Sequence, residues 1–311
     1  MKLSVSNTLL AALLALSSCR STREAGPGRV AESESAATTA VDSAEQVRIQ
    51  PTGSKADSAH ALPATAISEE EFKALHKPPT NIAPPRHGEM IEIDGTRAYL
   101  SLPPGAKAPI PGVIVIHEWW GLNANIMYWA DRIAAEGYAA IAVDLYGGVV
   151  ATDTDTAYSA MNVVDPARAV QTMLAAEEFL RTYPRILAPR TASIGWCFGG
   201  SQSLQLALAS PELDAAVVYY GNPIVDPAKL TPMRAELLGI FGTRDRSIPP
   251  EKVAAFEKAL ATAHKTATIR SFDAEHAFAN PSSARYDEGA AAEAWTIVRA
   301  FLKSKLTAPA H

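Results

Sequence analysis

The segment Gly195-Trp196-Cys197-Phe198-Gly199-Gly200 constrains this chain more than any other, because it places a single thiol between two predicted elements. We expect a strand over residues 191–194 and a helix over residues 199–209. The flanking glycines permit a sharp turn and a close approach of helix and strand behind the sulfur. This context is typical of a nucleophile elbow, which presents its side chain at the top of a sheet. The alternative is a buried structural cysteine, since free cysteine packs as a small hydrophobe.

Length and composition indicate one enzyme-sized domain with additional sequence. The chain has 311 residues, of which 48% are hydrophobic and 20% charged, with a net charge of -5. This charge gives no indication of a nucleic-acid partner. The two cysteines, Cys19 and Cys197, are far apart in the sequence, so no disulfide framework is predicted.

The N-terminus has the layout of a secretory signal peptide over residues 1–18. Lys2 precedes a short apolar stretch over residues 8–16, which is too short to span a bilayer. Leu16-Ser17-Ser18-Cys19 resembles a bacterial lipobox, in which the cysteine becomes the lipid-bearing first residue. We therefore expect an exported protein that is lipid-anchored to the cell envelope through Cys19. The alternative is an ordinary cleaved signal in which Cys19 is incidental.

The sequence that follows predicts a tether at the outer membrane. In lipoproteins of this type an aspartate after the cysteine tends to retain the protein in the inner membrane, and this chain has Arg20 there. The outer membrane, on its periplasmic face, is therefore favoured. Residues 19–83 are dominated by Ala, Ser, Thr, Glu, Gly and Pro. Such a segment buries too little apolar surface to offset its ordering entropy, so we expect a disordered tether.

From about residue 84 the pattern alternates between strand and helix, which predicts one α/β domain over residues 84–307. Strands are expected at 90–93, 96–100, 112–116, 139–143, 191–194, 215–220, 236–241 and 266–272. Helices are expected at 125–136, 166–181, 199–209, 250–264 and 287–305. The nearly all-apolar runs favour a mostly parallel, twisted sheet with helices on both faces.

The loops after the predicted strands carry the chemistry-bearing residues, as expected for an open α/β sheet. Glu118 and Trp119 follow one strand, Cys197 a second, Asp245 a third and His276 the last. The chain order of nucleophile, acid and histidine is the order that α/β-hydrolases use.

These residues predict a catalytic triad. Because only the thiolate attacks and a free thiol has a pKa of about 8.5, Cys197 needs a base, which His276 can supply. Asp245 would then hold the imidazole in one tautomer. Asp273 is the rival acid, but it is too close to His276 in sequence for easy pairing. The alternatives are a surface histidine and an aspartate that only stabilises a turn.

Six segments together resemble the dienelactone hydrolases, in order over nearly all of residues 84–306. They are residues 117–123 (HEWWGLN), 144–146 (DLY), 195–200 (GWCFGG), 219–221 (YYG), 242–245 (GTRD) and 275–278 (EHAF). The resemblance implies an α/β-hydrolase fold in which Cys197 is the nucleophile and Asp245 and His276 complete the triad. It also implies that Glu118 binds the resting thiol and is displaced when substrate arrives. Backbone N–H groups of Phe198 and Trp119 would form the oxyanion hole.

The chain departs from this family where the substrate would bind. Dienelactone-cleaving members grip a carboxylate with arginines, one of them four residues after the histidine, where this chain has Asn280. Residues 149–162, where the other arginine is expected, contain none. We therefore expect a more apolar pocket that includes Trp120, Tyr146 and Asn280 and prefers neutral esters or lactones. Arg244, Arg246 and Arg285 are the other cations near the predicted site.

The leading hypothesis is an envelope hydrolase that cleaves small esters or lactones through a thioester on Cys197. An acyltransferase or thioesterase would use the same triad, and a binding lipoprotein that kept the fold is the non-enzymatic alternative. Neither a metal nor an organic cofactor is expected, because no residue cluster has ligand spacing. The expected partners are a small-molecule substrate and, through the anchor, a membrane, and we expect a monomer.

Overall fold

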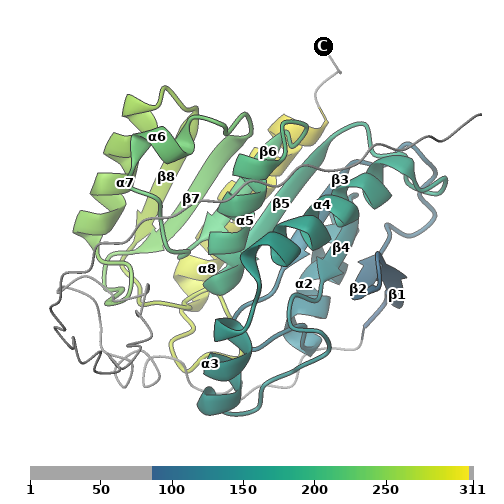
Figure 1. Ribbon diagram of the computed structural model, residues 1–311, viewed down its shortest axis with the longest axis horizontal. Coiled ribbons are helices and arrows are strands. Elements are labelled where there is room, and N and C mark those ends of the chain that lie inside the picture. Colours follow the sequence, from purple (N-terminus) through teal and green to yellow (C-terminus); the bar gives the residue numbers. More distant parts are fainter. Residues whose placement is uncertain (1–85, 308–311) are drawn as a thin grey trace, which may run out of the picture. The chain divides into compact units, whose positions relative to one another are not determined.

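The computed structural model of the chain describes residues 86–307 (Figure 1). The predicted signal peptide, lipidated Cys19 and tether lie outside the described residues. Within them, one eight-stranded sheet has the order β1-β2-β4-β3-β5-β6-β7-β8. Its strands are β1 (Glu89–Ile93), β2 (Thr96–Ser101), β3 (Gly112–Ile116), β4 (Ala139–Val143), β5 (Thr191–Trp196), β6 (Ala215–Tyr219), β7 (Glu236–Gly242) and β8 (Ala267–Phe272).

The sheet is antiparallel at one edge and parallel elsewhere. β2 pairs antiparallel with both β1 and β4, and the strands from β4 through β3 to β8 pair in parallel. All residues of β3, β4, β5 and β6 are buried. Their apolar runs follow from this burial, because helices cover both faces of the sheet.

The helices form two layers. They are α2 (Ala124–Ala135), α3 (Thr154–Asn162), α4 (Pro166–Thr182), α5 (Phe198–Ala209), α6 (Pro227–Leu230), α7 (Pro250–Thr262) and α8 (Glu288–Leu306). Side chains of α2 and α8 pack with Val113 and Val115 in one core, and side chains of α4, α5, α6 and α7 pack with Ile114 and Ile116 in the other. In Figure 1 the two layers are visible as α5 and α7 in front of the sheet and α8 behind it. Alternate side chains of one strand therefore serve opposite faces.

The α/β-hydrolase fold class is confirmed, and each predicted element is present with ends that differ by at most two residues. Two helices were not predicted from the sequence, α3 and the four-residue α6. α3 buries only Ala157 and Ala160, so it lacks the apolar period that identifies a helix. The start of α3 did carry a sequence signal, because aspartate is a preferred N-cap residue. In the structure the Asp153 side chain accepts a hydrogen bond from the Thr156 amide at 2.8 Å.

Sheet topology gathers the loops that follow the strands at one edge. β3 lies between β4 and β5, so the chain order reverses beside it, and such switch points are where open α/β sheets bind ligands. The register pairs Ile116 with Gly195, which brings the segments after β3 and β5 side by side. It likewise pairs Gly242 with Phe272 at the ends of β7 and β8.

Candidate active site

Cys197 occupies a strained turn between β5 and α5. Its backbone has φ 55° and ψ -116°, and its amide donates a hydrogen bond to the Tyr219 carbonyl at 3.0 Å. A Cβ on Gly195 would lie 2.1 Å from the Gly199 carbonyl oxygen, and one on Gly199 would lie 2.3 Å from the Ile116 carbonyl oxygen. Only glycine permits these approaches, which are those of a nucleophile elbow.

His276 and Asp245 form a buried pair. His276 Nδ1 lies 2.7 Å from Asp245 Oδ2, and both residues are at most 3% exposed. The other carboxylate oxygen, Oδ1, accepts hydrogen bonds from the amides of Ser247 at 2.7 Å and Ile248 at 3.0 Å. The rival acid, Asp273, has an 86% exposed side chain that pairs with Arg244. Asp245, and not Asp273, is therefore the carboxylate that pairs with the imidazole.

His276 also forms a side-chain hydrogen bond with Cys197. Burial by itself lowers the pKa of His276, but the attraction of Asp245 and Cys197, with hydrogen bonds to both, outweighs it and raises the pKa well above its usual value. For Asp245, burial raises the pKa, and the His276 contact and the two amides more than offset that effect. This arrangement favours an imidazolium between a carboxylate and the sulfur.

Glu118 is a buried carboxylate in the same site. Its Oε2 accepts a hydrogen bond from Asn280 Nδ2, its Oε1 is buried, and Tyr220 also interacts with the carboxylate. Burial raises the pKa of Glu118 to about 7, against opposing effects from His276, Asn280, Tyr220 and Arg285. Glu118 can therefore gain or lose a proton near neutral pH.

His117 orients the peptide group of the predicted oxyanion loop. Burial lowers its pKa to about 4, so the ring is neutral at pH 7. Its Nε2 accepts from the Leu145 amide at 3.1 Å, so Nδ1 carries the hydrogen and donates to the Glu118 carbonyl at 2.6 Å. Because N–H and C=O point oppositely in a trans peptide, the Trp119 amide is directed away from His117. Phe198, which stacks on His117, supplies the first amide of α5.

The predicted pocket residues lie on both sides of this loop. Trp119 and Trp120 form a small core with Ala151 and Ala157, and Phe198 packs against it. Ala157 belongs to α3, so this helix, which was not predicted, packs against the two buried tryptophans. Asn280 was predicted to line the substrate pocket, and the structure places its amide on Glu118.

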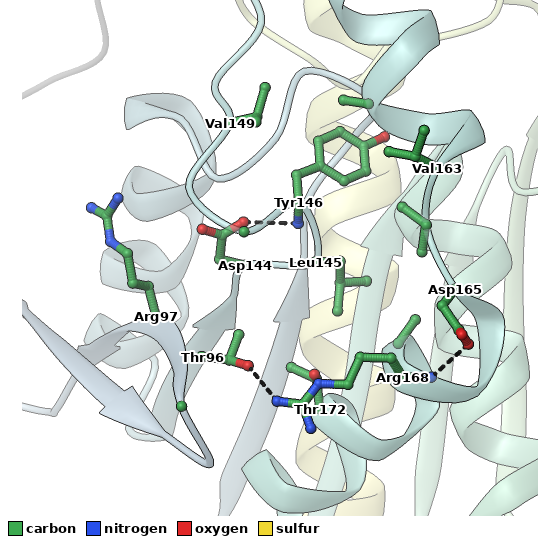
Figure 2. A pocket seen from close by; sticks show the side chains of 15 residues that line it. Thr96, Arg97, Asp144, Leu145, Tyr146, Val149, Val163, Asp165, Arg168 and Thr172 are labelled. Carbon is green, nitrogen blue, oxygen red and sulfur yellow. Dashed lines mark hydrogen bonds between the residues drawn. The ribbon is translucent and has the colours of Figure 1, made fainter.

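Tyr146 lines a separate cavity of about 510 Å³ (Figure 2). Its ring centroid is 4.6 Å from that of His117 and 5.4 Å from that of Phe198. The cavity is bounded by the β1–β2 turn, the loop after β4 and the start of α4, with Arg168 on the α4 side. Tyr146 thus contacts both the elbow and the cavity.

Sequence reasoning gave no separate role to His117 or Tyr220. Tyr220 is fully buried, its ring centroid is 5.0 Å from that of His276, and its hydroxyl affects the pKa of Glu118. Both residues stood in the motifs 117–123 and 219–221, so the signal was present without an assigned function. Asn123 was read as loop architecture, and its side chain caps α2 by accepting from the Ile126 amide at 3.2 Å.

Residues 86–307, the part of the chain that the structure describes, lack two features. No helix in this range is both long and apolar enough to cross a membrane. The same range holds no group of three or more His, Cys, Asp or Glu side chains placed to bind a metal ion.

Comparison with known proteins adds independent information. The family model described as "Dienelactone hydrolase family" matches residues 96–306. Protein usf of Aquifex pyrophilus is 32% identical over 236 residues, which cover 71% of this chain and 100% of that protein. A candidate carboxymethylenebutenolidase of Aquifex aeolicus is 29% identical and covers 70% of this chain and 99% of its own length. The crystal structure of a candidate dienelactone hydrolase from Klebsiella pneumoniae has a TM-score of 0.60 and 29% identity, covering 69% of this chain and 96% of its own.

Proposed function

Because the chain belongs to the dienelactone hydrolase family and is a hydrolase that acts on ester bonds, we propose that it cleaves small esters or lactones through a thioester on Cys197. The observation that carries this proposal is the buried His276–Asp245 pair, 2.7 Å apart, hydrogen-bonded to a cysteine in a strained elbow. A structural cysteine needs neither the strained turn nor the charged pair.

The first half-reaction is a proton transfer followed by attack. Glu118 is the acceptor that we propose for the thiol proton, since its pKa of about 7 suits exchange at neutral pH, whereas His276 is held protonated. The thiolate attacks the ester carbonyl, and the resulting oxyanion accepts hydrogen bonds from the Phe198 and Trp119 amides. The C–O bond then breaks, and the departing alkoxide takes a proton from His276.

The second half-reaction returns the enzyme to its starting state. Neutral His276 takes a proton from water, and the hydroxide adds to the thioester carbonyl. The C–S bond breaks, the carboxylic acid leaves, and Glu118 returns its proton to the sulfur. The net reaction is ester plus water to acid plus alcohol.

Incubation with a panel of activated esters and lactones, followed by intact-mass measurement, tests this mechanism. We expect a mass increase equal to the acyl group in the wild type and none in Cys197→Ala, with turnover lost in that variant. Cys197→Ser should be a poor enzyme, because an alcohol is far harder to deprotonate than a thiol. Ester hydrolysis at the wild-type rate by folded Cys197→Ala would contradict the mechanism. Acyl groups passed mainly to an added alcohol or thiol would instead identify an acyltransferase.

Substrate charge is a separate part of the proposal. We propose that neutral, moderately apolar esters are preferred, because the pocket side of the loop after β3 is aromatic and Asn280 is engaged with Glu118. Arg244 pairs with the exposed Asp273. The ratio of kcat/KM for carboxymethylenebutenolide and for its methyl ester measures the preference. A large preference for the free acid would contradict it and assign the carboxylate to Arg285, whose charge interacts with Glu118 and Cys197.

We also propose the lipid anchor at Cys19. A single acyl chain binds membranes only weakly, so stable anchoring needs the several chains that a bacterial lipoprotein carries. Cys19→Ala should move the protein to a soluble fraction or leave an unprocessed precursor. Membrane fractionation and processing like those of the wild type would show that Cys19 is not the anchor.

A further inference from the structure

A continuous series of hydrogen bonds, partly buried at its Asn125 end and buried beyond it, leads from the start of α2 to Glu118. Asn125 Nδ2 donates to Ser282 Oγ, and Ser282 Oγ lies 2.7 Å from Asn280 Oδ1. Asn280 Nδ2 then donates to Glu118 Oε2. Ser282 is fully buried and Asn280 is 7% exposed. We call these three polar residues, Asn125, Ser282 and Asn280, the relay.

The chemistry of the groups sets the direction of the relay. Asn280 Oδ1 accepts two hydrogen bonds, from the Ser282 amide at 2.8 Å and from the Ser282 hydroxyl. Both bonds require the carbonyl side of the Asn280 amide to face Ser282, so the NH₂ side must face Glu118. The Ser282 hydroxyl has one hydrogen, which it gives to Asn280, and it can therefore accept from Asn125. Each member donates toward the carboxylate.

We propose that the relay residues are positioning residues that hold Glu118 with Oε2 occupied and Oε1 open to exchange a proton with the Cys197 thiol. This inference rests on the proposed function, in which Glu118 takes that proton. The relay also connects the loop after β8, which carries His276, to the segment after β3, which carries Glu118. It therefore sets the distance between the two groups that handle protons.

Other charged and titratable groups face Glu118 and must be kept constant in a test. They are His276 and Arg285 from the loop after β8, and Tyr220, which directly follows β6. The Asn280 hydrogen bond lowers the pKa of Glu118, so its removal should raise that pKa further above its usual value. The proposed reaction needs ionised Glu118. As the pH falls, the variant should therefore lose activity at a higher pH than the wild type does.

The experiment is the pH dependence of kcat/KM for one activated ester between about pH 5 and about pH 9, for the full chain. The acidic limb is the fall of kcat/KM at low pH. If it reports the protonation of Glu118, it should disappear in Glu118→Gln. Asn280→Leu removes the donor at similar volume and should move the limb upward by about one pH unit. Ser282→Ala, a milder change, frees the Asn280 amide to turn and should move the limb in the same direction by less. Thr296→Ala, at an exposed position of α8 outside the relay, is the control and should keep the wild-type limb.

The outcomes separate the relay from the mechanism. If Glu118→Gln loses the limb while folded Asn280→Leu and Ser282→Ala keep it unchanged, the relay is overturned and the mechanism stands. If Glu118→Gln keeps the limb, both the relay and the proton role of Glu118 are wrong, although acylation of Cys197 can still be detected by mass. Thermal melts of each variant establish that the compared enzymes are folded.

Discussion

At the scale of single residues, burial separates two aspartates that the sequence made rivals. Asp245 is 2% exposed and surrounded by donors, whereas the Asp273 side chain is 86% exposed and faces solvent with Arg244. A carboxylate can hold an imidazolium only where water does not screen the pair. The local environment therefore assigns the orienting role, and sequence distance from His276 was only an indirect guide to it.

Asp245→Asn should lower kcat by about 10²–10⁴-fold, because the amide cannot stabilise the imidazolium and favours the wrong tautomer. The fold should persist, since the side chain is nearly the same size. Asp273→Asn is the matched control and should keep wild-type kinetics. Steady-state hydrolysis of an activated ester measures both variants. Equal losses in the two variants would contradict the assignment of Asp245.

At the scale of elements, the elbow depends on backbones that approach too closely for any side chain. Gly199, the second residue of α5, faces the carbonyl oxygens of Ile116 and His117. The first turn of α5 therefore lies directly against the end of β3. This contact brings the Phe198 amide to the segment that carries Trp119.

Gly199→Ala should destabilise the protein by roughly 3 kcal/mol and reduce ester hydrolysis, because the added Cβ would lie 2.3 Å from the Ile116 carbonyl oxygen. Gly289→Ala in α8 is the matched control, since its Cβ would come no closer than 3.6 Å to Asp287 Oδ1. That variant should be neutral or slightly stabilising, as alanine is the better helix former. Thermal or urea unfolding compares the two, and equal stabilities would refute the packing argument.

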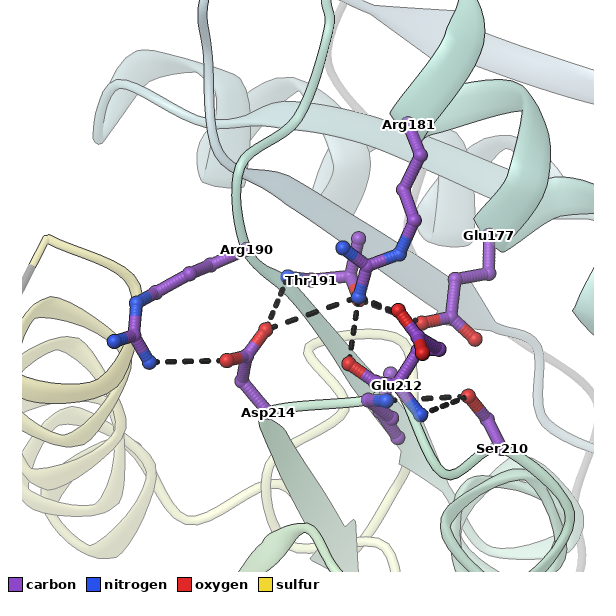
Figure 3. A network of polar contacts seen from close by, with 8 residues as sticks. Glu177, Arg181, Arg190, Thr191, Ser210, Glu212 and Asp214 are labelled. Carbon is purple, nitrogen blue, oxygen red and sulfur yellow. Dashed lines mark hydrogen bonds and ion pairs between the residues drawn. The ribbon is translucent and has the colours of Figure 1, made fainter. Parts of the chain in front are cut away.

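At the scale of the whole described fold, the two ends of the parallel strands have different tasks. The carboxyl ends carry the candidate site, and the amino ends carry a polar network (Figure 3). In that network Glu177 accepts hydrogen bonds from Thr191 Oγ1 at 2.7 Å and from Arg181 at 3.2 Å. Arg181 also reaches the Glu212 carbonyl at 2.6 Å. The network joins α4 to the start of β5, far along the strand from Cys197.

Glu177→Ala should lower the free energy of unfolding by about 2–3 kcal/mol, because it removes the buried acceptor of the Thr191 hydroxyl and one of the carboxylates that pair with Arg181. The kcat/KM of the folded enzyme should not change, since no contact links Glu177 to the site. Glu178→Ala, on the neighbouring exposed side chain, should leave stability nearly unaltered. A change in kcat/KM at full folding would show that the two ends of the sheet are coupled.

Much of the fold was predictable because its signals are local. The all-apolar runs of β3 and β4 identify buried parallel strands, and Gly195, Cys197 and Gly199 identify the elbow without knowledge of the neighbouring segments. The sequence likewise shows the chain order of Cys197, Asp245 and His276 and places each of them after a predicted strand. α3 escaped prediction because its two buried alanines leave no apolar period.

The sequence by itself determined the order of the strands along the chain, the turn that carries the thiol and the set of candidate side chains, because these depend on residues close together. Only the tertiary structure decided that Asp245 pairs with His276, that Asn280 donates a hydrogen bond to Glu118, and that His117 orients the loop carrying Trp119. The first two contacts join segments that follow different strands, and the Leu145 amide, which follows β4, fixes the tautomer of His117, which follows β3. Which segments meet is set by the sheet order and its register, so no local pattern could specify those partners.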